Sequence, residues 1–162
     1  MRVRVLSAVL ALVGAALASA FPPVPPPKAK KVKEEKLSVK ALEGTWTVSS
    51  YEYRSARGIS TNILYPTIEI KDGKWVQKRE LNGRPISLSP YTIKIDAKQT
   101  PQHFDMSLAN SKVTATARKG LFRLDGDRLT VTYTLGNKDR PSSVDGGLEV
   151  SQYRWVLKRQ KP

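Results

Sequence analysis

Hydrophobic and polar residues alternate along much of the chain, and the pattern is clearest at residues 120–133. There, apolar residues occupy every second position on both sides of an Asp-Gly-Asp break, which is typical of a tight β-hairpin. A two-residue loop of Gly126 and Asp127 places Leu124 opposite Leu129, whereas a loop one residue earlier places Leu124 opposite a carboxylate. We therefore expect the first register.

The same period of two predicts strands elsewhere, joined mostly by short turns. Asp-Gly at 72–73 indicates a second hairpin, and residues 54–62 are polar and predict a loop. Asn-Gly at 82–83 either ends its strand or forms a hairpin loop with a short partner at 86–88. Residues 136–147 are too irregular to place. The alternating runs lie at residues 45–53, 68–70, 75–81, 91–95, 104–108, 113–124, 129–133 and 153–157.

These runs make about eight strands, and no stretch has a 3.6-residue period long enough for a helix. Consecutive hairpins of this number predict an all-β fold. An antiparallel up-and-down β-barrel is the natural closure, because closure removes the unpaired edges of an open sheet.

The N-terminal segment has the pattern of a secretory signal peptide. Arginines precede an apolar run, and Ala-Ser-Ala at 18–20 predicts cleavage between Ala20 and Phe21. The run is shorter than the roughly 20 apolar residues of a membrane-spanning helix. We therefore expect a signal peptide at 1–20 and a periplasmic or secreted protein with no membrane span after cleavage.

Residues 21–37 are rich first in proline and then in lysine and glutamate. Such a segment cannot join a sheet or a helix, so we expect either a solvated spacer or a disordered tail. The predicted barrel domain is then 38–161.

Charge and cysteine content narrow the function classes. Lys and Arg number 28 against 14 Asp and Glu, and the predicted domain stays basic without its leader and linker. This surplus favours anionic partners, of which an envelope polymer is the leading expectation. Nucleic acid is not expected, because no recognition motif is present and the basic residues are interspersed with acidic ones. The chain has no cysteine, which removes disulfides and thiol chemistry.

No residue pattern predicts a catalytic site, a metal site or a cofactor. The single histidine, His103, with Asp105 supplies at most two metal ligands from one strand face, and no third is suggested by spacing. Residues 125–127 lack the spacing and distal glutamate of a calcium loop. One histidine without a G-x-S-x-G motif offers no pair of nucleophile and base.

Large apolar side chains at inward positions either line a pocket for a small apolar ligand or fill the barrel. Barrels of about eight strands lie at the size where both occur, and the bulk of these side chains favours filling. The candidates are Trp46, Ile68, Trp75, Ile93, Met106, Phe122, Val131, Tyr133 and Trp155.

Several segments together resemble an uncharacterised domain family abundant in Planctomycetes. The pattern comprises LEGTW at 42–46, LDGD at 124–127 followed by Leu129, Arg-Pro at 140–141 and LKR at 157–159. The match covers residues 42–159 in order. Members of that family are regarded as lipocalin-like (calycin-like), so the resemblance implies an antiparallel barrel and no established activity.

Residues 44–46 are also similar to the G-x-W with which true lipocalins begin their first strand. In those proteins the tryptophan packs under a basic side chain near the last strand. The resemblance therefore implies a structural clasp between Trp46 and Arg159, or Lys158.

Taken together, the sequence predicts an exported, non-enzymatic binding or interaction module. It would bind a small apolar ligand in the barrel or an anionic partner on its basic surface. The alternative is an enzyme of unknown class whose site is formed from loop carboxylates.

Overall fold

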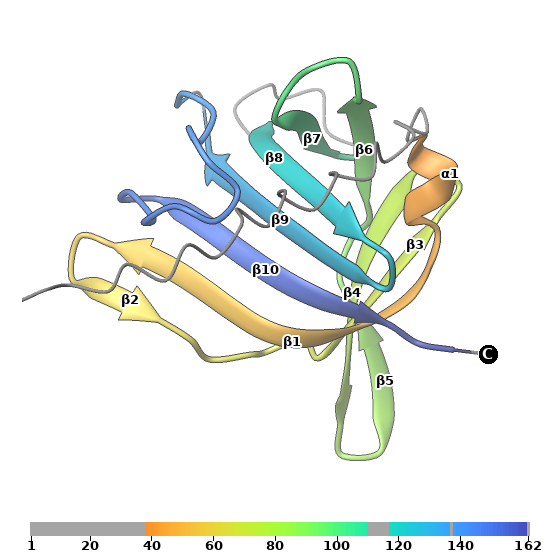
Figure 1. Ribbon diagram of the computed structural model, residues 1–162. Helices are drawn as coiled ribbons and strands as arrows, with labels where there is room; N and C mark the ends of the chain where they lie inside the picture. Colours follow the sequence, from red (N-terminus) through yellow and green to blue (C-terminus); the bar gives the residue numbers. More distant parts are fainter. Residues whose placement is uncertain (1–37, 110–116, 137, 162) are drawn as a thin grey trace, which may run out of the picture. The chain divides into compact units, whose positions relative to one another are not determined.

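The computed structural model describes residues 38–109, 117–136 and 138–161. The predicted signal peptide with its cleavage site at Ala20 and Phe21, the linker, and the first part of the 113–124 run lie outside these residues. Figure 1 shows the secondary structure, which consists of α1 (Val39–Leu42), β1 (Gly44–Ser55), β2 (Gly58–Ser60), β3 (Thr67–Lys71), β4 (Lys74–Leu81), β5 (Arg84–Ser87), β6 (Tyr91–Asp96), β7 (Gln102–Leu108), β8 (Arg118–Asp125), β9 (Arg128–Leu135) and β10 (Gln152–Arg159).

The described strands form one antiparallel sheet that closes into a barrel. Its order is β10-β9-β8-β7-β6-β4-β3-β1, and pairing of β1 with β10 completes the ring. The predicted all-β, up-and-down barrel of about eight strands is therefore confirmed. Strands β2 and β5 are hairpin extensions of β1 and β4, and Figure 1 shows the β4–β5 hairpin pointing away from the barrel.

Turn chemistry sets the register of two hairpins. Leu124 pairs with Leu129 across the loop of Gly126 and Asp127, as predicted. Asn82 and Gly83 form the two-residue loop between β4 and β5, with φ of 53° and 72°. Positive φ at both central residues defines a type I′ turn, which Asn-Gly favours. The hairpin alternative for this pair is therefore correct.

The prediction that 54–62 is only a loop was wrong. Strand β2 pairs with the end of β1, with Ser55 opposite Gly58. Its three residues are all exposed, so they carry no alternation of apolar and polar residues from which a strand could be predicted.

A β-bulge in β1 changes which side chains face the interior. Val48 is opposite Leu157 and Ser50 is opposite Val156, so Ser49 is an extra residue without a partner on β10. Trp46 and Val48 face inward before the bulge. After it, the inward positions are Tyr51 and Tyr53. Simple alternation, by contrast, would turn Tyr51 outward.

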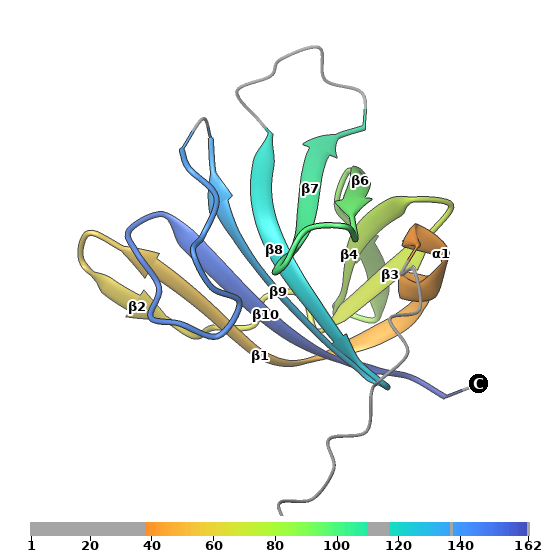
Figure 2. The ribbon, with the colours of Figure 1, turned by 45° about the horizontal axis from the view of Figure 1, so that its top comes forward.

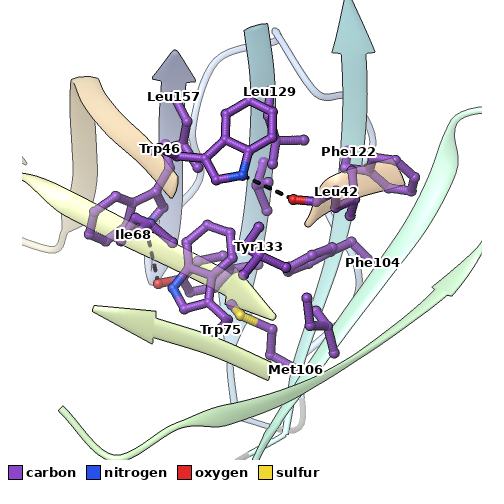
Figure 3. Packing of buried hydrophobic residues seen from close by; sticks show 14 of the residues in the cluster. Leu42, Trp46, Ile68, Trp75, Phe104, Met106, Phe122, Leu129, Tyr133 and Leu157 are labelled. Atoms are coloured by element: carbon purple, nitrogen blue, oxygen red, sulfur yellow. Dashed lines mark hydrogen bonds between the residues drawn. The ribbon is translucent and has the colours of Figure 1, made fainter. Parts of the chain in front are cut away.

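The barrel is filled over most of its length by a hydrophobic core. Figure 3 shows the close packing of Trp46, Leu42 and Leu157 above Trp75 and Phe104. All nine candidate positions belong to this cluster, each at most 5% exposed. The interpretation of these residues as a filled core thus describes most of the interior.

The connection between β9 and β10 covers part of the outer face. Val144 and Leu148 are buried, and the Thr132 hydroxyl on β9 donates a hydrogen bond to the Val144 carbonyl at 2.7 Å. Arg154 on β10 holds this connection in place by donating hydrogen bonds to the carbonyls of Val144, at 3.1 Å, and Gly146. Alternation of apolar and polar residues did not predict the position of this segment, because its folding depends on contacts with β7, β8, β9 and β10.

Candidate binding site at the open end of the barrel

A pocket of about 130 Å³ opens at one end of the barrel. Figures 1 and 2 show α1 at one end and the β1–β2 hairpin at the other. We call these the closed end and the open end; the pocket belongs to the open end, beside the connection from β2 to β3. Its lining residues are Tyr51, Asn62, Leu64, Tyr65, Gln77, Arg118, Tyr133, Tyr153 and Trp155.

Three tyrosines form a stack across the wall beside this pocket. Tyr53, Tyr153 and Tyr133 are direct cross-strand partners on β1, β10 and β9. The ring centroids of Tyr53 and Tyr153 are 4.2 Å apart, and those of Tyr153 and Tyr133 are 5.1 Å apart with planes inclined by 10°. Cross-strand aromatic pairs stabilise a sheet and present rigid apolar surface.

Gly120 provides room for the last ring of this stack. It lies directly opposite Tyr133 on β8. A Cβ atom at this position would lie 2.8 Å from both the Tyr133 Cβ and the Thr132 carbonyl oxygen. Only glycine therefore fits between β7 and β9 without displacing backbone.

Arg118, at the start of β8, brings a positive charge to the pocket. Its guanidinium carbon lies 4.1 Å from the ring centroid of Tyr91 and 5.2 Å from that of Tyr133. It donates hydrogen bonds to the hydroxyl oxygens of Tyr91, at 2.7 Å, and Tyr133, at 3.2 Å. The Trp155 indole N–H also donates to the Tyr133 hydroxyl, at 3.2 Å. These contacts fix the guanidinium between two rings.

The arginines on the outer face have a different environment. Arg123 forms ion pairs with Asp125 and Asp145, Arg140 with Asp105, and Arg154 with Glu52. Among the residues that the structure describes, no carboxylate forms an ion pair with Arg118. These arginines on the outer face are thus balanced by carboxylates, whereas Arg118 on the inner face contacts tyrosine hydroxyls and rings.

Burial keeps the hydroxyls of Tyr51, Tyr133 and Tyr153 neutral well above physiological pH. Burial, with smaller contributions from Tyr133 and Tyr53, raises the pKa of Tyr51 to about 12, although Arg118 acts in the opposite direction. Burial also raises the pKa of Tyr133 and Tyr153. The site therefore offers neutral hydroxyls and one guanidinium.

A separate cluster at the closed end contains the two residues of the expected clasp. The Arg159 guanidinium carbon lies 4.1 Å from the Trp46 ring centroid. Arg159 donates to the carbonyls of Ala41, at 2.8 Å, and Glu43, while Trp46 donates to the carbonyl of Leu42 at 3.0 Å. Figure 3 shows the latter bond. These contacts hold α1 across the barrel end.

Gly44 explains the glycine of the G-x-W sequence. It has φ of +134°, and a Cβ atom there would lie 2.9 Å from Arg159 Nη1. Both the backbone conformation and the space under the arginine thus favour glycine.

Of the nine candidate positions, Tyr133 and Trp155 line the pocket. The other seven lie in the core but are not among the lining residues. Sequence reasoning did not select Arg118, Tyr51 or Tyr153 for the site. Arg118 has the same parity as the inward residues of β8, so its inward position could have been predicted from the sequence. The inward position of Tyr51 could not, because the bulge interrupts the alternation of β1.

No group of three or more His, Cys, Asp or Glu side chains suited to a metal ion occurs within residues 38–109, 117–136 and 138–161. Asp105, which the sequence pairs with His103, is bound to Arg140. In the same part of the chain, no helix is both long and apolar enough to cross a membrane. Comparison with protein-family models, curated proteins and solved structures finds no match to this chain.

Proposed function

We propose that this protein is an exported, non-enzymatic binding module that holds a small ligand at the open end of its barrel. The observation that carries the proposal is the position of the pocket. The barrel interior is filled elsewhere, whereas this end has a concave space with tyrosine and tryptophan side chains around it. A larger hollow of about 410 Å³ beside Asp125 and Lys158 has no aromatic side chain among its described lining residues. Concave sites with an apolar lining and few polar groups are typical of ligand sites.

The pocket volume limits the size of the ligand. Sites for drug-sized molecules enclose about 300–1,000 Å³, and an apolar cavity of about 150 Å³ accommodates benzene. A pocket of about 130 Å³ therefore suits a molecule with one ring, or a short chain, rather than the long apolar ligands that large barrels enclose.

The enzyme alternative receives less support from the loop carboxylates. Asp125 and Asp145 are both engaged by Arg123, and Asp127 lies 3.8 Å from Arg159. Carboxylates in such pairs serve structural contacts. Non-enzymatic binding is accordingly the function that we propose.

Two exposed side chains offer a matched test. Leu64 lines the pocket and is 58% exposed, whereas Ile59 on β2 is 56% exposed and lies outside the lining. We expect one-ring compounds such as benzamide to bind the full chain in ¹H–¹⁵N correlation spectra, with signals of pocket residues shifting.

The L64A variant should weaken this binding about fivefold, because contact area with the ligand is lost. The I59A variant should bind as the parent does. The proposal fails if no one-ring compound shifts pocket signals at millimolar concentration, or if both variants bind as the parent protein does.

A further inference from the structure

We propose that the ligand of the open-end pocket is a one-ring carboxylate whose charge is bound by Arg118. This inference rests on the proposed binding function and adds the chemical class of the ligand. Three observations support it: the charge balance around Arg118, the donors that its guanidinium retains, and a second inward arginine close by.

Within the described part of the chain, no carboxylate forms an ion pair with Arg118. Residues 110–116, which precede its strand, include no Asp or Glu. The side chain is half-buried between Tyr91 and Tyr133. A cation withdrawn from water is stable only when it is compensated, and neutral hydroxyls and ring faces compensate it in part.

The guanidinium also retains donors. To described residues it gives one hydrogen bond from each Nη atom, out of five N–H groups in a planar fork. The Tyr133 hydroxyl accepts bonds from both Arg118 and Trp155, so the fork is fixed in place. A fixed fork suits the two oxygens of a carboxylate, which it binds with both charge and geometry.

A second arginine on an inward position of β4 adds to the positive potential. Arg79 lies with its guanidinium carbon 5.2 Å from the ring centroid of Tyr65, a pocket residue. Its Nε atom is buried and has no hydrogen-bond partner among the described residues. Its position alternates with those of Trp75 and Gln77. Neither Arg118 nor Arg79 forms an ion pair with a carboxylate of the described residues, so together they attract an anion to the open end.

Aromatic contact and pocket volume indicate the remainder of the ligand. Tyr51 and Trp155, which meet edge to face with centroids 4.7 Å apart, line the pocket, and the space holds about one ring. Of the two arginines only Arg118 lines the pocket. One guanidinium there balances one negative charge, so a monoanionic carboxylate fits better than a phosphate ester.

Benzoate and benzamide provide the test, because they are nearly identical in shape and differ in charge. We would titrate the full chain with benzoate, benzamide and acetate by isothermal calorimetry. Benzoate should bind at least about tenfold more tightly than benzamide, since charged hydrogen bonds are the stronger ones. Acetate, which lacks the ring, should bind at least about tenfold more weakly than benzoate.

Two variants of Arg118 separate charge from geometry. R118M should abolish the preference for benzoate, and a near-UV circular dichroism spectrum like that of the parent would show that the pocket has folded. R118K should retain part of the preference. The matched control is R54M, which removes the same charge from an exposed residue of β1 and should leave the preference unchanged.

Equal binding of benzoate and benzamide by the parent protein would overturn the carboxylate inference while leaving the binding function intact. The inference would also fail if R118M kept the preference or if R54M removed it. Absence of binding by all three compounds would overturn this inference together with the proposed function.

Discussion

Replacing Arg159 by methionine should destabilise the fold through the closed end of the barrel. Methionine keeps much of the apolar stem of arginine but removes the guanidinium. The change therefore removes the contact with the Trp46 ring and the hydrogen bonds to the carbonyls of Ala41 and Glu43. Leu42, which α1 inserts into the core at 0% exposure, would lose the tether that holds it.

The magnitude follows from these contacts. A partly desolvated cation–π contact contributes about 1 kcal/mol, and each hydrogen bond from a charged donor contributes about 1.5 kcal/mol. Because the Arg159 side chain is 26% exposed, water replaces part of this, and we expect a loss of about 3 kcal/mol. For a domain of about 120 residues, the entropy of unfolding converts this loss into a decrease of about 12 °C in the thermal midpoint.

Urea unfolding followed by tryptophan fluorescence, together with scanning calorimetry, measures this change. The control is R128M, because Arg128 is exposed on the neighbouring strand β9 and its replacement should change the free energy of unfolding by less than about 0.5 kcal/mol. A decrease for R159M no larger than that for R128M would refute the stabilising role of the clasp.

Three further predictions concern stability. W46A should lower the free energy of unfolding by about 3–5 kcal/mol in urea titrations, because it leaves a cavity in the core. G120A should cost about 2 kcal/mol through the clash of its Cβ with backbone, whereas G147A, where a Cβ meets nothing within 4 Å, should be neutral in the same assay. Stability should fall between pH 10 and about 12, because Tyr51 ionises at pH 10 when unfolded but near 12 when folded; pH-dependent calorimetry should show a smaller fall for Y51F.

The barrel was predictable from the sequence because its strands and hairpins follow from patterns among residues that are close along the chain. Alternation predicts the strands, and pairing of Leu124 with Leu129 selects the register of the β8–β9 hairpin. Short connections between antiparallel strands then leave little choice of neighbours. Strand β2 was missed because exposed residues need no alternation.

The pocket was harder to predict because it depends on long-range pairing. The bulge at Ser49 brings Tyr51 to the inner face, and no local sequence pattern predicts a bulge. Arg118 faces inward by parity, yet only the three-dimensional structure shows that it lies beside Tyr91 and Tyr133 and forms no ion pair with a described carboxylate. Side-chain chemistry at the site thus needs the three-dimensional structure.

The seam between β1 and β10 also has a consequence for how the chain folds over time. It joins segments at opposite ends of the domain, as the hydrogen bond between Gln160 and Thr47, 113 residues apart, illustrates. Closing so long a loop carries an entropic cost that hairpins avoid, and non-local pairing slows folding. The ring is therefore incomplete until the final strand has been synthesised, and before then the free edges of β1 and β9 are open to pairing with other chains.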